Sequence, residues 1–171
     1  MSFLNVEIKA RHRDISHVRN YLLQHNADFR GTDLQVDTYF SVSQGRLKLR
    51  EGNIENNLIY YKRDTQPGPK SSQFHLVKVE DVAGLKEILS QSNGIKVIVE
   101  KKREIYFINN VKFHIDEVPG LGNFIEIEAS NKGYDLTREE LQVQCNFYMK
   151  ELKVEEAFLL SESYSDLMQR L

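Results

Sequence analysis

Charged side chains occupy every second position in several segments of this sequence, and their spacing is the first sign of chemistry. In residues 5–11, Val6, Ile8 and Ala10 alternate with Asn5, Glu7, Lys9 and Arg11. An extended chain puts alternate residues on opposite faces, so this segment predicts a strand with one apolar and one charged face. At least six segments have this alternation, which places further charges at Arg46, Lys48, Arg50, Lys62, Lys101, Arg103, His114, Asp116, Glu126 and Glu128.

Two architectures account for such strands. In the first, the charged faces point to water and the sheet packs through its apolar face, the common arrangement for an alternating strand. In the second, the sheet closes on itself and the charged faces line a lumen. The apolar faces are then on the outside and need helices to cover them.

A closed sheet would bring many cations into one cavity. The candidates are Lys9, Arg11, Arg46, Lys48, Arg50, Lys62, Lys101 and Arg103. Burying so much positive charge is unfavourable unless an anion offsets it. A polyphosphate suits such a site, because Arg offers a planar fork to phosphate oxygens and Lys a compact charge.

Carboxylates on the charged faces of the same strands would repel phosphate, so they need a different partner. The candidates are Glu7, Asp116, Glu126 and Glu128. Glu7, Glu126 and Glu128 together would hold Mg²⁺ or Mn²⁺, hard cations that take oxygen ligands and bridge to phosphates. Cations facing carboxylates in this way indicate a metal–polyphosphate site.

Composition limits the classes of protein. The 171 residues suggest a single domain spanning residues 1–171, and 40% apolar with 28% charged residues is typical of a soluble chain. The net charge of −2 gives no basic field for nucleic acid. We expect no nucleic acid or membrane partner, a cytoplasmic location, and a monomer or homodimer. The only cysteine, Cys145, is expected to be a core residue.

The rest of the sequence supplies the elements that position these residues. Strands are expected at residues 3–11, 32–42, 46–51, 58–63, 74–79, 95–108, 111–118 and 124–129. Asp14 and Asp81 are placed to cap helices, and Thr137 with Glu140 matches a capping box that begins a helix over 137–152. Further helical segments are expected at 154–160 and 163–168, and the prolines at 67 and 69 predict a loop over 66–69.

About eight strands joined mostly by hairpins, with helices between and after them, predict an α+β fold with an antiparallel sheet. Eight strands suffice to close a barrel, and the amphipathic helices would cover its apolar outside. The prediction is therefore a closed eight-stranded antiparallel β-barrel with helices packed outside and charged faces inside.

The sequence resembles the CYTH domains, which are also called triphosphate tunnel enzymes. The family motif Glu-x-Glu-x-Lys is matched by Asn5, Glu7 and Lys9, and the resemblance covers nearly the whole chain. The other matching segments are 37–40, 45–50, 58–62, 101–103, 113–118, 120–128 and 163–167. They look most like the class IV adenylyl cyclase branch.

The resemblance implies a tunnel formed by eight antiparallel strands. It implies metal-binding carboxylates at Glu7, Glu126 and Glu128 with Asp116 close by, and triphosphate-holding residues at Lys9, Lys48, Arg50, Lys62 and Arg103. Strand parity adds Lys101 to the phosphate-binding set. Lys9, Arg50 and Lys62 are the cations expected to take part in catalysis. One departure is Asn5, since an amide can ligate a metal through its carbonyl oxygen but brings no charge.

Three smaller features have two interpretations each. His114 lies at lumen parity and could assist proton transfer or be a hydrogen-bonded structural histidine. Tyr39 and Tyr60 could contact an organic group or simply pack within the strands. Residues 70–72 could form a lid over one end of the lumen or a plain surface loop.

The functional prediction is a metal-dependent enzyme that acts on a triphosphate such as ATP, thiamine triphosphate or tripolyphosphate. Attack by a ribose 3′-hydroxyl on the α-phosphorus of ATP gives cyclic AMP and pyrophosphate, the reaction of an adenylyl cyclase. Attack by water on the γ-phosphorus gives a diphosphate and phosphate, the reaction of a triphosphatase. A triphosphate-binding module without turnover and a plain sheet protein are the alternatives.

Overall fold

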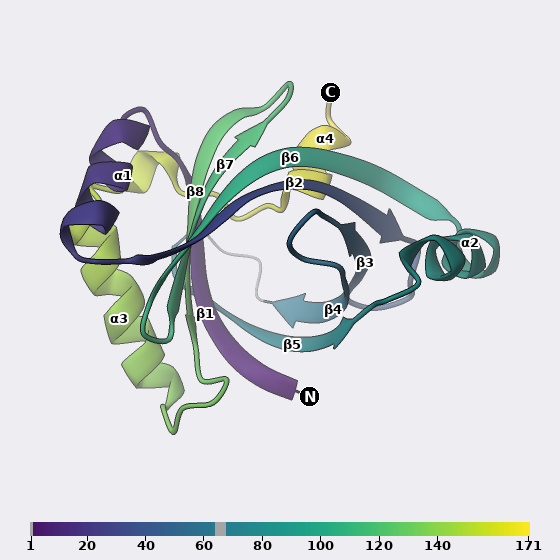
Figure 1. Ribbon diagram of the computed structural model, residues 1–171, viewed down its shortest axis with the longest axis horizontal. Coiled ribbons are helices and arrows are strands. Elements are labelled where there is room, and N and C mark those ends of the chain that lie inside the picture. Colours follow the sequence, from purple (N-terminus) through teal and green to yellow (C-terminus); the bar gives the residue numbers. More distant parts are fainter. Residues whose placement is uncertain (1, 64–67) are drawn as a thin grey trace.

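The computed structural model describes residues 2–63 and 68–171 of the chain. Within these residues the fold has eight strands and four α-helices (Figure 1). The strands are β1 (Ser2–Arg11), β2 (Asp28–Phe40), β3 (Arg46–Glu51), β4 (Asn57–Arg63), β5 (Lys70–Lys78), β6 (Ile95–Ile108), β7 (Val111–Val118) and β8 (Gly122–Ser130). The helices are α1 (Ile15–Gln24), α2 (Val82–Asn93), α3 (Arg138–Glu151) and α4 (Tyr164–Met168), with a 3₁₀ turn at Glu156–Phe158.

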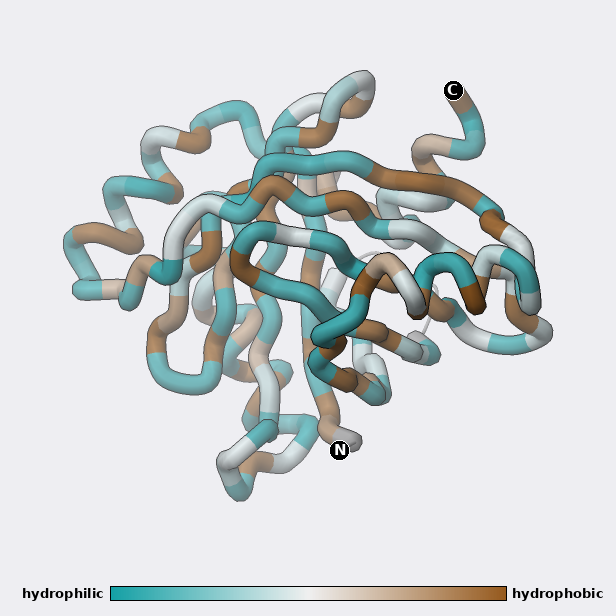
Figure 2. The backbone as a smooth tube through the Cα atoms, turned by 45° about the vertical axis from the view of Figure 1, so that its right-hand side comes forward, coloured by the Kyte–Doolittle hydropathy of each residue, from teal (hydrophilic) through white to brown (hydrophobic). Residues whose placement is uncertain are grey.

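The strands pair in a closed ring in the order β1-β5-β4-β3-β2-β6-β7-β8, and β8 returns to β1. Every pairing is antiparallel. This confirms the α+β class and the expected closure of an eight-stranded antiparallel sheet. Apolar and polar segments alternate along the strands (Figure 2), as two-faced strands require.

Two helices cover one side of the ring. α1 and α3 lie on the same side of the sheet (Figure 1), against the outer faces of β1, β7 and β8. Val6, Ile8, Leu22, Phe113 and Cys145 belong to this core and are essentially inaccessible to solvent. Cys145 is therefore a core residue as expected, and burial raises the pKa of its thiol to about 12.

The helices begin where the capping residues predict. The carboxylate of Asp14 accepts a hydrogen bond from the backbone N–H of His17 at 3.0 Å, and that of Asp81 accepts one from Gly84 at 2.9 Å. Thr137 and Glu140 form the predicted capping box at the start of α3. These caps satisfy backbone donors that have no partner within the helix.

Several segment boundaries differ from the predictions. Residues 70–72 are neither a lid nor a surface loop, because they begin β5 and pair with residues 5–7 of β1. Of residues 154–160, only Glu156–Phe158 is helical, while Leu159 forms an isolated bridge to Ala10. The second strand spans Asp28–Phe40 rather than 32–42. The loop expected at 66–69 lies partly outside the described residues.

Candidate functional site

The ring encloses a cavity that is lined by side chains from all eight strands. Of the predicted phosphate-binding and metal-binding residues, it brings together Glu7, Lys9, Lys48, Arg50, Lys101, Arg103, Glu126 and Glu128. These residues are far apart in the sequence and share the inward parity of their strands. The structure therefore has the second of the two architectures described above, a closed sheet whose charged side chains face a lumen.

A cationic wall formed by β2, β3 and β6 surrounds the carboxylate of Asp37. Lys48, Arg50 and Lys101 reach this carboxylate at 3.1, 2.9 and 2.7 Å, and Asp37 itself has no solvent exposure. Burial acts to raise the pKa of Asp37, but the three cations outweigh it and hold that pKa well below its usual value. Asp37 is thus a built-in counter-anion, which the parity analysis did not single out.

Asp116, a predicted metal-binding carboxylate, is hydrogen-bonded to two side chains of the lumen. Its two oxygens accept from Nε and Nη2 of Arg103 at 2.7 and 2.6 Å, and its Oδ2 also accepts from the Tyr164 hydroxyl at 2.7 Å. Burial acts to raise the pKa of Asp116, but Arg103 lowers it on balance. With both oxygens engaged by Arg103 and Tyr164, Asp116 orients Arg103, and its metal-binding role stays a prediction.

Glu126 lies among three donors. Lys9 Nζ approaches Glu126 Oε1 at 3.2 Å, and Glu126 Oε2 contacts Arg103 Nη2 at 3.2 Å and His114 Nδ1 at 3.0 Å. Burial and the nearby charge of Arg103 lower the pKa of His114 to about 4, so the imidazole is neutral at pH 7. His114 then donates from Nδ1 to Glu126, and its buried Nε2 meets no partner within the part of the chain that the structure describes.

Glu7 and Glu128 face one another across the β1–β8 ladder, and Lys112 of β7 lies beside Glu128. Burial, together with the charges of Glu7 and Glu126, raises the pKa of Glu128 to about 7 although Lys112 opposes the shift. In residues 2–63 and 68–171, no group of three acidic, His or Cys side chains is placed so that it could hold a metal ion by itself. The crowded carboxylates nevertheless fit Mg²⁺, which binds through one or two carboxylates and completes its shell with phosphates and water.

The raised pKa of Glu128 predicts an unusual pH dependence of stability in EDTA. The folded group keeps its proton up to about pH 7, whereas the unfolded group, with an ordinary value of 4.5, has already lost it. The free energy of unfolding should therefore fall as the pH rises through this interval. Urea titrations at pH 5 and 8 should show a larger decrease for the wild type than for Glu128→Gln, and identical decreases would contradict the proposed crowding.

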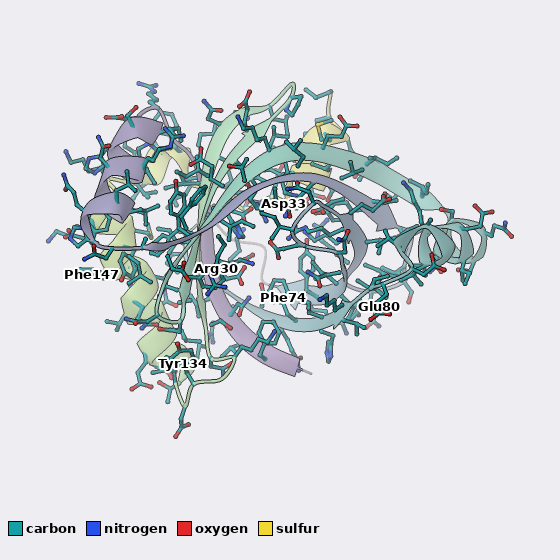
Figure 3. The ribbon with its side chains drawn as sticks, viewed as in Figure 1. Arg30, Asp33, Phe74, Glu80, Tyr134 and Phe147 are labelled. Atoms are coloured by element: carbon teal, nitrogen blue, oxygen red, sulfur yellow. The ribbon has the colours of Figure 1, made fainter. Side chains whose placement is uncertain are left out.

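A loop between β3 and β4 adds a carboxylate that the strand pattern could not reveal. Asp33, on the inner side of β2 (Figure 3), accepts from the backbone N–H groups of Ile54 and Glu55 at 2.9 and 3.0 Å. This holds the side chain of Glu55 in the cavity, 3.3 Å from Lys112 and 3.9 Å from Arg50. Burial acts to raise the pKa of Glu55, but these cations lower it on balance.

The third side of the cavity is apolar. β4 supplies Ile59 and Tyr61, and β5 supplies Phe74 and Leu76, with Phe74 pointing into the ring (Figure 3). Outside, the side chains of Gln73 and Val77 on β5 are exposed. The inward face of this part of the sheet is therefore the more apolar one, opposite to the faces of β1 and β8.

The prediction that Lys62 lines the lumen is wrong. On β4 the inward parity belongs to Ile59 and Tyr61, so Lys62 points outward, is exposed, and donates to Gln44 Oε1 at 3.0 Å. The prediction assumed that a helix covers each strand from outside, but α1 and α3 pack on other strands. Arg46 and Arg11 lie at the rim, where Arg46 pairs with Asp166 at 2.8 Å and Arg11 donates to the carbonyl of Leu121.

Replacing Lys62 should therefore have little effect on a reaction in the lumen. We expect Lys62→Ala to keep kcat/KM for a triphosphate within about twofold of wild type, the usual effect of an exposed substitution. Lys48→Ala, on the neighbouring strand β3 but facing inward, should lose roughly tenfold or more. Steady-state kinetics of the two variants side by side test this, and equal losses would show that Lys62 reaches the substrate.

The C-terminal segment closes one end of the cavity. Tyr164 of α4 is buried in the lumen, with Lys9 Nζ lying 3.7 Å from the centre of its ring. Leu160 donates its backbone N–H to the carbonyl of Lys9 at 2.9 Å, and its own carbonyl accepts from Lys70 Nζ at 3.0 Å. Lys70, a fully buried lysine, was missed because residues 70–72 were not assigned to a strand.

Comparison with known proteins agrees with this architecture. The chain is 27% identical over 179 residues to MJ0240 of Methanocaldococcus jannaschii, provisionally named an adenylate cyclase, with 96% of this chain and 98% of that protein covered. Its fold matches the PH1012 protein of Pyrococcus horikoshii with a TM-score of 0.77 and 22% identity, covering 95% and 98% of the two chains.

A second solved structure has the same fold. HpAC1 of Hippeastrum, provisionally named an adenylyl cyclase and described as having a dominant triphosphatase activity, matches with a TM-score of 0.61 and 12% identity, over 94% of this chain and 91% of its own. None of the described helices is both long and apolar enough to span a bilayer. Residues 4–159 match the family model of the CYTH domain, so the chain belongs to the CYTH family, whose members act as adenylyl cyclase-like or triphosphatase enzymes.

Proposed function

We propose that this protein is a metal-dependent enzyme that acts on a triphosphate inside the ring, most closely as a class IV adenylyl cyclase that converts ATP to cyclic AMP and pyrophosphate. The observation that carries the proposal is the opposition of two walls. Lys48, Arg50 and Lys101 gather on one side of the cavity, and Glu7 and Glu128 lie on the other. A chain of phosphates with a divalent cation on one edge complements both walls.

The cations of the lumen supply most of the binding. Arg50 and Arg103 are held rigidly by Asp37 and Asp116, so their remaining N–H groups are already oriented when phosphate oxygens arrive. Lys9 and Lys48 add positive charge where negative charge develops on the phosphates during transfer. Burial and the nearby cations lower the pKa of Lys101 well below its usual value although Asp37 opposes the shift, so a phosphate beside Lys101 would favour its charged form. Burial strengthens each of these interactions relative to water.

The carboxylate side supports the same reaction. A bound Mg²⁺ or Mn²⁺ would polarise the phosphoryl group and neutralise charge on its oxygens. Glu7, Glu126 and Glu128 are the residues that would hold it. Glu128, with its pKa near 7, is the carboxylate whose protonation state changes most readily when a cation approaches.

Triphosphatase activity is the second candidate. Both reactions use the same cationic wall and differ in whether the ribose 3′-hydroxyl or water attacks. The fold neighbour HpAC1, described as having a dominant triphosphatase activity, favours this alternative. The direction in which a substrate enters the lumen determines which phosphorus meets the nucleophile.

Product analysis tests the proposal. The purified chain is incubated with ATP, thiamine triphosphate or tripolyphosphate and Mg²⁺ or Mn²⁺, and the products are separated by chromatography, with EDTA as the blank. Cyclic AMP and pyrophosphate from ATP support the cyclase, and free phosphate from any of the three supports the triphosphatase. Absence of any product overturns the enzymatic proposal. Tripolyphosphate that still raises the melting temperature would then indicate a binding module.

Substitution of Asn5 tests whether the chain is a binding module without turnover. The residue occupies the first acidic position of the family motif, is buried and lines the cavity. If the native chain binds without turnover, Asn5→Glu should restore activity by adding a fourth carboxylate to the set formed by Glu7, Glu126 and Glu128. If the native chain is active, the same change should add to the crowding around Glu128 and lower the stability in EDTA.

A further inference from the structure

The apolar side of the cavity has no role in holding phosphates or a metal. Resting on the proposed function, we propose that it is a subsite for a planar heteroaromatic ring. The substrate would then be an organic triphosphate that carries such a ring, rather than inorganic tripolyphosphate. The residues concerned are Phe3 of β1, Phe74 of β5 and Tyr61 of β4, together with the amide of Asn5.

The three aromatic side chains form one row across three neighbouring strands. Phe3 pairs in register with Phe74, and Phe74 pairs with Tyr61. Their rings are nearly parallel, with centroids 6.1 Å apart for Phe3 and Phe74 and 5.1 Å apart for Tyr61 and Phe74. Because the rings stack on one another, the row offers a flat ligand ring an apolar surface of ring edges, with a free ring face only at its ends.

The row lines open space. Phe3, Tyr61 and Phe74 all line the cavity, and Phe3 and Phe74 remain half-buried although they point toward the interior of a closed ring. In a filled core, side chains of this size would be fully enclosed by neighbours. An inward-facing aromatic surface that remains partly accessible is typical of a site for an organic group.

The row also adjoins the phosphate-binding wall. Lys48 Nζ lies 5.8 Å from the centre of the Tyr61 ring and 3.1 Å from Asp37 in the cationic wall. A molecule with phosphates at Lys48 and Arg50 would therefore have its organic end beside Tyr61 and Phe74. The two surfaces together match a ligand that is polyanionic at one end and aromatic at the other.

Polar atoms at the edge of the row add a means of selection. Asn5 and Ser72 are each 1% exposed and lie opposite one another on β1 and β5. Both amide atoms of Asn5 and the hydroxyl of Ser72 meet no hydrogen-bond partner within residues 2–63 and 68–171. Buried polar groups are nearly always hydrogen-bonded. We therefore infer that these atoms bind the ring nitrogens or amino group of a heteroaromatic ligand.

Calorimetry tests this inference with tripolyphosphate, ATP and thiamine triphosphate as probes, in EDTA so that metal-dependent turnover is stopped. The variants are Tyr61→Leu, Phe74→Leu and Asn5→Ala. Tyr60→Leu is the matched control, because Tyr60 is the adjacent tyrosine on the outward face of β4 and its hydroxyl donates to the carbonyl of Gln44. Circular dichroism melts establish that each variant is folded, and Phe74→Leu, with a half-buried side chain, carries the test if Tyr61→Leu does not fold.

We expect Tyr61→Leu and Phe74→Leu to weaken the binding of at least one ring-bearing probe by about tenfold, the effect typical of lost base stacking, and to leave tripolyphosphate within about twofold. Asn5→Ala should weaken the same probe, and Tyr60→Leu should change neither ligand. The preference between ATP and thiamine triphosphate identifies the kind of ring.

Two results would overturn the subsite. One is wild-type binding of tripolyphosphate as tight as that of both ring-bearing probes. The other is an equal loss for all probes in the aromatic variants, which would mean a structural role. Failure of wild type to bind any of the three probes, both in EDTA and with Mg²⁺, is a different result, since it removes the proposed function itself.

Discussion

Glu128→Gln should lower kcat for the preferred triphosphate at least about 100-fold, because charge stabilisation by a metal is worth several kcal/mol and about 1.4 kcal/mol corresponds to tenfold. The variant should nevertheless remain at least as stable as wild type at pH 8 in EDTA. At that pH the native carboxylate is charged and crowded by Glu7 and Glu126, and the amide removes this repulsion. Initial rates over a range of Mg²⁺ concentrations, together with urea unfolding, measure both effects.

The control for this experiment is Glu117→Gln on β7, whose side chain is exposed on the outside of the ring. It should leave both rate and stability nearly unchanged. Glu126→Gln gives a further contrast, because Glu126 contacts Lys9 and Arg103 and its loss should destabilise the fold as well as reduce activity. If Glu128→Gln retained most of its activity at saturating Mg²⁺, the assignment of Glu128 to the metal would be wrong.

Asp37→Asn should lower the free energy of unfolding by about 3–5 kcal/mol, the range for removing one partner from a buried ion pair. The substitution leaves Lys48, Arg50 and Lys101 close together without the carboxylate that all three contact. An added polyanion can replace that charge. Tripolyphosphate should therefore raise the melting temperature of Asp37→Asn by more than it raises that of wild type.

Asp28→Asn provides the matched control. Asp28 also pairs with an arginine, at 2.6 Å, but its side chain is 59% exposed and that of Arg30 is 58% exposed. An exposed pair of this kind contributes little, so the stability of Asp28→Asn should stay close to wild type. Equal stability losses for the two variants, or no additional effect of tripolyphosphate on Asp37→Asn, would show that Asp37 does not act as the counter-anion of the lumen.

Much of the fold could be predicted from the sequence because its signals are local. The period of two in residues 5–11, 46–51 and 124–129 predicts strands with a charged face, and the structure has β1, β3 and β8 there. Asp14, Asp81 and Thr137 predict helix starts because a capping side chain bonds to backbone only two or three residues away. The number of strands and the helices suggested closure, and the ring is closed.

Which face of each strand points inward was decided by tertiary structure. Strand parity separates two faces but does not say which one is covered, and the cover comes from helices distant in the sequence. α1 and α3 bury the apolar faces of β1, β7 and β8, so charge points inward there. On β4, Lys62 points outward and is exposed, whereas the apolar face of the strand points inward. The side chain that β4 contributes to the lumen is therefore Tyr61 and not a cation.

The partners of the charged residues were likewise set in three dimensions. The sequence alone determined that many cations and several carboxylates share one lumen, and it correctly placed Lys9, Lys48, Arg50, Lys101, Arg103, Glu7, Glu126 and Glu128 there. It could not show that Asp37 neutralises three of the cations or that Asp116 is committed to Arg103. Electrostatic interactions between side chains fall off over a few ångströms in water and depend on burial, so only the closed ring determines which charges pair and which remain to meet a substrate.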